Sequence, residues 1–116
     1  MEKILELAKQ LGQEIANDSI AKQYFDASKS LDEDSEAQEL IKQYEQQAQQ
    51  LAMKERQAQP VEPQEKQKLS DLQTKIAENP TIKQWMQAQV EYVNLLRKVN
   101  ETVMAQMPNQ PKAQEQ

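Results

Sequence analysis

The fold is decided by residues 79–107, which read NPTIKQWMQAQVEYVNLLRKVNETVMAQM. Asn79 is a favourable N-cap, Pro80 suits the first helical position, and neither glycine nor proline recurs before Pro108. The segment therefore predicts one uninterrupted helix from Pro80 to Met107. Such a helix is about 42 Å long, whereas a compact globule of this chain length has a radius of gyration of about 13 Å. We expect the helix to extend beyond its own domain.

The apolar face of this segment is wider than one core requires. A helix that covers a core on one side needs an apolar stripe of only about 100°. Here a broader arc is apolar, so we expect the helix to meet two surfaces, its own domain and a partner subunit. The arc holds Ile82, Trp85, Met86, Tyr92, Val93, Leu96, Val99, Val103, Met104 and Met107.

Two amides and several thioether side chains lie on this arc. Gln89 and Asn100 fall near its middle, where a buried amide costs stability but can fix register and partner number. Each amide could equally bond a nearby carbonyl or lie at a wet edge. We predict core positions for Trp85 and Met86, and interface positions for the methionines at the overhanging end. The predicted interface comprises Gln89, Val93, Leu96, Asn100, Val103, Met104 and Met107.

The composition of the 116-residue chain predicts an all-α protein. With Gly 1, Cys 0 and 4% aromatic residues, the chain lacks the turn glycines and packing aromatics of β-sheets and the cysteines of a disulfide scaffold. We predict about five helices in an elongated helical hairpin or bundle with a long C-terminal helix. Residues 1–107 should form a single domain, and residues 108–116, which have no apolar periodicity, a disordered tail.

Helical periodicity and capping residues place four earlier helices. Apolar residues at helical spacing predict helices at 3–16, 20–30 and 35–57, and a narrower apolar stripe predicts a fourth helix that begins near Pro63. Short connections make neighbouring helices antiparallel. We therefore expect the third and fourth helices to form a hairpin and the last helix to fold back along it.

Two local features admit both a structural and a functional interpretation. Gly12, the only glycine, predicts the close approach of a neighbouring helix, and a functional kink is the alternative. The acidic run at 32–36 predicts capping of a helix N-terminus, because free N–H groups and the helix dipole favour carboxylates there. A calcium loop is the sharper alternative, but it needs a glycine turn and a regular ligand spacing that this run lacks.

The residue types argue against catalysis and cofactor binding. The chain has no histidine and no cysteine, which removes the commonest general base, the thiolate nucleophile and the usual transition-metal ligands. A single glycine excludes a glycine-rich phosphate loop. Carboxylate pairs such as Glu36 and Glu39 could serve hydrolysis or bind two metal ions, although bundle sites of that kind pair glutamate with histidine. We predict no enzyme activity, no metal site and no cofactor.

Charge and hydropathy restrict the class of partner. The formal net charge is -5 and the basic residues are scattered, whereas a nucleic-acid binder concentrates them in a stripe, so direct nucleic-acid binding is disfavoured. Glu2, Lys3, Glu6 and Lys9 interrupt the first apolar residues, so the start of the chain does not resemble a signal peptide. No stretch approaches the roughly 20 apolar residues of a membrane span. We expect a cytoplasmic protein.

One set of apolar, small and capping positions extends through every predicted helix, and its order and spacing are more informative than any single motif. The set comprises Leu11, Gly12, Ile15, Ser19, Tyr24, Ala27, Leu31, Asp34, Ala37, Leu40, Ile41, Tyr44, Gln47, Leu51, Leu72, Ile76, Asn79, Pro80, Ile82, Leu95, Leu96, Val99 and Asn100. From about Ile4 to Met107, this pattern resembles the YlbF/YmcA family of small helical bacterial regulators.

That resemblance implies an all-α cytoplasmic protein without catalysis of its own, which forms a homodimer or larger homo-oligomer or joins related helical subunits. Characterised relatives act in a complex that modulates an endoribonuclease at the membrane and so influence mRNA processing, competence, sporulation and biofilm formation. Some relatives hold an iron–sulfur cluster through cysteines, which this chain lacks, and the family's hairpin loop often carries glycine where this chain has Pro60 to Pro63. A holdase-like chaperone or general helical scaffold is the alternative function, because methionine-rich apolar surface and glutamine-rich polar faces would also serve it.

Overall fold

The computed structural model describes residues 1–108, and helices account for most of them. No strand occurs in this described part of the chain, which confirms the all-α prediction. Beyond Pro108, the predicted tail lies outside the described residues. In chain order the helices are α1 (Glu2–Asn17), α2 (Ser19–Glu33), α3 (Ser35–Arg56), α4 (Pro63–Glu78) and α5 (Pro80–Met104).

The chain divides into two compact units. Unit 1 comprises Met1–Tyr24 and Ala88–Gln116, and unit 2 comprises Phe25–Gln87. Unit 1 therefore holds α1, the start of α2 and most of α5, while unit 2 holds the rest of α2, α3, α4 and the start of α5. The prediction that the last helix folds back along the hairpin is wrong, because α5 from Ala88 onward clusters with α1 instead.

Unit 2 has a core of aliphatic side chains. Leu31, Ala37 and Ile82 form a buried cluster that joins α2, α3 and the start of α5, and the indole of Trp85 packs against it. The indole Nε1 of Trp85 donates a hydrogen bond to the hydroxyl of Ser28 (3.0 Å). The predicted core position of Trp85 is therefore confirmed. This indole satisfies its one polar atom while most of its surface leaves water.

Met86 does not share that core. Its side chain is 50% exposed, so the predicted core position of Met86 is wrong. One residue along a helix turns the side chain by about 100°, and this rotation carries Met86 away from the cluster that Trp85 contacts. The position of Met86 around the helix, rather than its hydrophobic character, decides that this side chain is exposed.

Carboxylate and amide side chains begin two helices of unit 2. Asp34 Oδ1 accepts a hydrogen bond from the backbone N–H of Ala37 (3.0 Å) at the start of α3, which confirms the capping role of the acidic run. Asn79 Oδ1 likewise accepts from the backbone N–H of Ile82 (3.0 Å) at the start of α5. Each cap satisfies an N–H group that has no partner inside its own helix.

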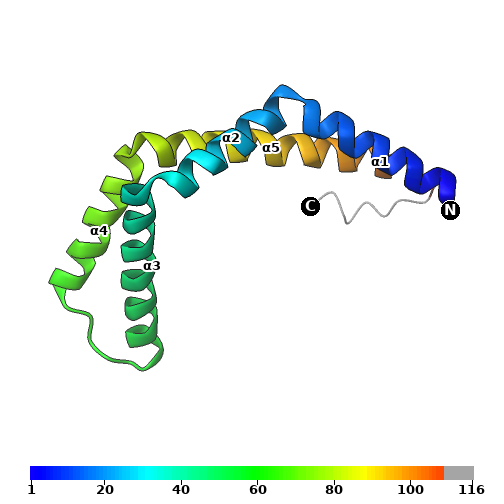
Figure 1. Ribbon diagram of the computed structural model, residues 1–116. Coiled ribbons are helices and arrows are strands. Elements are labelled where there is room, and N and C mark those ends of the chain that lie inside the picture. The colour runs from blue at the N-terminus through cyan, green and yellow to red at the C-terminus, as the bar shows by residue number, and fades with distance from the viewer. Residues whose placement is uncertain (109–116) are drawn as a thin grey trace. The chain divides into compact units, whose positions relative to one another are not determined.

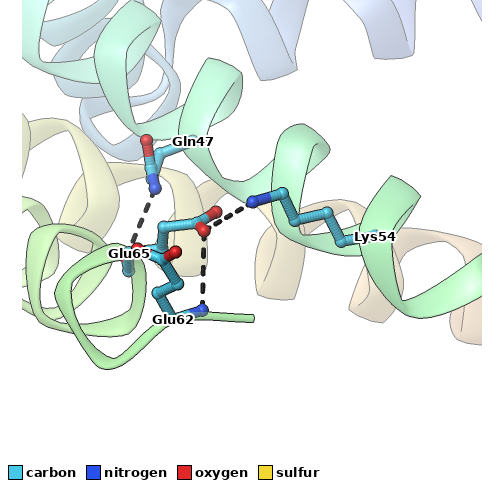
Figure 2. A network of polar contacts seen from close by, with 4 residues as sticks. All are labelled: Gln47, Lys54, Glu62 and Glu65. Atoms are coloured by element: carbon cyan, nitrogen blue, oxygen red, sulfur yellow. Dashed lines mark hydrogen bonds and ion pairs between the residues drawn. The ribbon is translucent and has the colours of Figure 1, made fainter. Parts of the chain in front are cut away.

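α3 and α4 form the predicted hairpin and lie side by side (Figure 1). Near its tip, Lys54 Nζ donates to Glu65 Oε1 (2.5 Å), and buried Gln47 donates from Nε2 to the backbone carbonyl of Glu65 (3.3 Å) (Figure 2). The hydrogen bond from Lys54 is the main cause that lowers the pKa of Glu65. Glu65 Oε1 also accepts from the backbone N–H of Glu62 (3.5 Å), so one side chain ties the start of α4 to α3. In the connecting loop, Ala58 has a left-handed backbone with φ 55°.

Unit 1 encloses much less apolar surface. α1, all of which is described, has no buried residue. Among the described residues of unit 1, the hydrophobic side chains that are buried are those of Ala21 and Ala88. The rings of Tyr24 and Tyr92 stack with centroids 4.6 Å apart and planes 5° from parallel. Unit 1 is thus held by small side chains and one aromatic stack, and no large aliphatic side chain of its described part is buried.

The C-terminal end of α5 differs slightly from the predicted end at Met107. The helix ends at Met104, and the next residues form turns. The backbone N–H of Gln106 donates to the carbonyl of Val103 (3.2 Å), and that of Met107 donates to the carbonyl of Met104 (3.0 Å). These bonds span three residues and tighten the last turn. The following Pro108 disfavours helical geometry at the residue before it.

Candidate protein-protein interface

Two contacts within unit 1 give the direction of α1 relative to α5. Tyr24 lies next to Tyr92, and Leu11 lines an open hollow of about 260 Å³ with Val99 and Val103. Going from the first contact to the second, the residue numbers decrease from Tyr24 to Leu11 on one segment and increase from Tyr92 to Val103 on the other. The two segments are antiparallel (Figure 1). Leu11 lies level with the part of α5 around residues 98–103, because these residues line the same hollow.

One edge of α1 is apolar or small and lies beside the side of the helix that faces α5. Ile15 is half-buried and Leu11 lines the hollow, so their side of α1 faces α5. About a quarter turn away is an exposed edge on which Leu5 has 59% of its surface in contact with solvent. The predicted close neighbour of Gly12 is not found there: within the described chain, no other helix comes within 4 Å of the position that a Cβ would take. This edge consists of Met1, Leu5, Ala8, Gly12 and Ala16.

α5 has a matching exposed edge. Tyr92, Leu95 and Val99 are half-buried and define the side of α5 that faces α1. About a quarter turn away the side chains are again apolar or amide, and most of them are exposed. This second edge consists of Gln89, Val93, Leu96, Asn100, Val103 and Met107.

The two edges lie on the same side of the helix pair. In a right-handed helix, residues turn clockwise along the chain when viewed from the N-terminus, and an antiparallel neighbour turns the opposite way in the same view. On both helices the exposed edge follows the packed side by a positive rotation, so the two edges point to one common side. We call the two edges together the open face; it carries no charged side chain, as the centres of protein interfaces rarely do.

The predicted interface residues are largely on this face. Val93, Leu96, Asn100, Val103 and Met107 are exposed in this chain, while Gln89 and Met104 are half-buried. Whether a partner covers them remains a prediction.

The edge of α1 was not predicted from the sequence as part of a binding surface. The sequence does contain an indication of this edge, because apolar or small residues at helical spacing cover about half the circumference of α1. The extreme positions of this arc are Leu7 and Ala16. So wide an arc on a short helix indicates two contacting surfaces, as it does for α5.

Other kinds of site receive less support. Within residues 1–108, no cluster of three or more acidic, histidine or cysteine side chains could hold a metal ion, and no helix is long and apolar enough to cross a membrane. Unit 2 has an open hollow of about 440 Å³ beside the start of α5, with Glu36, Lys75 and Glu78 in its lining. Charges of both signs there favour no single class of ligand.

Comparison with known proteins gives a family and a fold. A family model described as control of competence regulator ComK, YlbF/YmcA, matches residues 4–108. Among solved structures, the chain is similar to RicA of Bacillus subtilis, whose structure was determined in complex with RicF. The two chains are 21% identical, with a TM-score of 0.77 over 87% of this chain and 90% of the RicA chain. At that identity the likeness concerns the fold. No curated protein sequence matches the chain.

Proposed function

This chain belongs to the YlbF/YmcA family, and we propose that it is a non-enzymatic regulatory subunit that acts by binding other helical proteins. The observation that carries the proposal is the open face of unit 1. Val93, for example, is 54% exposed, and Val103 is 44% exposed. A contiguous apolar patch of this kind is typical of a protein interaction site rather than of an isolated monomer.

The energetics favour coverage of this face. Full burial of one valine, leucine or methionine side chain stabilises a structure by about 1.5–3 kcal/mol. The described part of unit 1 buries only alanines among its hydrophobic residues, whereas a pair of helices gains most of its stability from packing of large apolar side chains. A partner that covers the open face would supply the packing that unit 1 lacks.

The resemblance and the structural similarity suggest the class of partner. RicA was crystallised with RicF, which supports the proposal that this chain also joins another protein through its helices. By family resemblance, the partners are related small helical subunits and an endoribonuclease complex in the cytoplasm. The process regulated would then be mRNA processing and, through it, competence, sporulation and biofilm formation.

The test is affinity capture of the tagged protein from its own cell lysate, with nuclease added, followed by mass spectrometry. We expect related small helical proteins or an endoribonuclease to be retained. Leu96→Glu places a charge on the open face and should abolish this retention, whereas Asn94→Glu places the same charge on an exposed position of α5 outside the face and should not. Equal retention by both variants would overturn the role of the open face.

A holdase-like chaperone is the second candidate, since the uncovered apolar side chains would also bind unfolded chains. It predicts that the purified protein suppresses aggregation of an unrelated unfolding protein. It also predicts capture of a broad set of unfolded clients. That result, without the related subunits or the endoribonuclease, would replace the regulatory proposal.

A further inference from the structure

The apolar side of α1 loses its cover toward the start of the helix. Ile4, Leu11 and Ile15 lie on one line along α1, because they are separated by seven and four residues. Ile15 is half-buried, Leu11 is 39% exposed and Ile4 is 68% exposed. Leu11 lies level with residues 98–103 of the antiparallel α5, and α5 ends at Met104. Seven residues of helix therefore carry Ile4 past the end of α5, and Figure 1 shows α1 extending beyond it.

The exposed apolar surface at the start of α1 is a continuous patch. Wound at about 100° per residue, its four large side chains cover an arc of about 160° over the first two turns. Only Met1 and Leu5 among them belong to the open face, so the patch is wider than the edge already described. We call it the N-terminal patch. It consists of Met1 (88% exposed), Ile4 (68%), Leu5 (59%) and Leu7 (54%).

The charged side chains of the first turns are ordered around this patch. Lys3 and Lys9 lie at its two borders, each about 40° around the helix from the nearest apolar side chain of the patch. Glu2 and Glu6 lie between the two lysines, on the side of α1 opposite the patch. All four charged side chains are exposed. The cations therefore flank the apolar surface, and the anions point away from it.

This order of charges fits a lipid surface. An amphipathic helix that lies in the plane of a membrane surface buries its apolar face about 5–10 Å into the boundary between headgroups and acyl chains. A lysine at the border of that face lays its methylene stem along the apolar surface and extends its ammonium group toward the lipid phosphates. A glutamate on the opposite side remains in water. A folded protein could cover the patch without requiring cations at both borders, so the charge order favours lipid as the cover.

We propose that the start of α1 is a lipid-binding element, which inserts the N-terminal patch into the surface of a phospholipid bilayer. The helix lies on the bilayer, since no helix within residues 1–108 is long and apolar enough to cross it. Two lysines and two glutamates give residues 2–9 no net charge, so burial of apolar surface drives the binding. The chain itself makes this contact, which is separate from the protein contacts proposed along α5.

Flotation of the full chain with phosphatidylcholine vesicles tests the proposal. The natural chain should float with the vesicles, and added salt should change the bound fraction little. Ile4→Glu and Leu7→Glu each remove an apolar contact and should lower the partition coefficient by about tenfold or more. Gln10→Glu places the same charge on the polar side of α1 and should change the coefficient little. The proposal is overturned if the natural chain does not float, or if the three variants float alike.

Two comparisons separate lipid binding from the proposed function. Leu96→Glu, which should abolish retention of partner proteins, should float as the natural chain does. Loss of flotation in this variant would overturn the proposal, because the lipid contact would not be confined to α1. Ile4→Glu should still retain partner proteins from lysate. A natural chain that retains proteins through Ile4 but does not float would replace the lipid surface with a protein partner.

Single cysteines provide a positional readout that adds no charge, because the natural chain has no cysteine. A polarity-sensitive fluorophore attached to Leu7→Cys should shift its emission to shorter wavelength when vesicles are added, because the patch enters the bilayer. The same fluorophore attached to Gln10→Cys should not shift. Equal shifts at the two positions, or no shift at either, would overturn the proposal.

Discussion

Units 1 and 2 are both helical, but they differ in what their helices enclose. In the described part of unit 1, Ala21 and Ala88 are the buried hydrophobic residues, and the larger side chains of α1 and of the second half of α5 remain accessible. The difference teaches that unit 2 has a core of large aliphatic side chains within the chain, whereas the described part of unit 1 has none. Unit 2 buries several larger aliphatic side chains, namely Leu31, Leu51, Leu72 and Ile82.

The largest effect expected from this difference is on the stability of the isolated chain. Ile82 is 3% exposed in the cluster of unit 2, so Ile82→Ala should lower the free energy of unfolding by about 2–5 kcal/mol through lost burial and a cavity. Leu96 is 38% exposed, and Leu96→Ala should cost less than about 1 kcal/mol in a monomer because little packing is lost. Urea unfolding of dilute protein would measure both. Equal losses would remove the distinction between the units.

A smaller effect concerns acid stability, which should depend on a cap in unit 2. The backbone N–H of Ala37, and next the side chain of Thr81, lower the pKa of Asp34 below its ordinary value of 3.8. Because the folded pKa is the lower one, the stabilisation is complete above the unfolded value and is lost as the pH falls through the folded value.

The measurement for this cap is the midpoint of thermal unfolding between pH 6 and pH 2. Asp34→Asn keeps an N-cap side chain but does not titrate, so the midpoint should fall less steeply with acid than in the natural protein. Asp32→Asn removes the same charge from a residue that does not cap α3, and it should follow the natural curve. If Asp34→Asn is as acid-sensitive as the natural chain, another group determines the response.

The smallest effect should be on the stability of α1. Gly12→Ala meets no other helix of the described chain, so it should raise the free energy of unfolding by about 0.5–1 kcal/mol through helix propensity. Urea unfolding followed by circular dichroism measures this effect. A lower free energy of unfolding than that of the natural chain would show that the added methyl group is not accommodated at this position.

Much of the fold could be predicted because helix signals are local. Asp34 and Asn79 mark helix starts through side-chain hydrogen bonds to residues only three positions away, and Pro63 begins α4 as the sequence indicates. The family could be identified from the sequence for a similar reason, because the order and spacing of the apolar, small and capping positions extend over the whole matched region. These features require no knowledge of what each helix packs against.

The features that failed depend on contacts between distant residues. Periodicity placed Trp85 and Met86 on one arc, but the width of the packed surface decides which of the two is buried, and Met86 falls outside it. Short loops suggested that α5 returns along the hairpin, yet the apolar side chains of α1 provide a competing surface for its second half. The prediction at Gly12 identified a need for space, but the sequence alone could not say whether its own chain or another fills it.

The hairpin tip offers a practical use. The ends of its loop are held by the Lys54–Glu65 ion pair and the Gln47 hydrogen bond, both made between the helices rather than by the loop itself. Residues in the loop are exposed or nearly so, and Ala58 already tolerates an unusual backbone. Exposed tips of this kind accept insertions well. A fluorophore or affinity tag placed between residues 57 and 62 should therefore leave the packing of α3 on α4 intact.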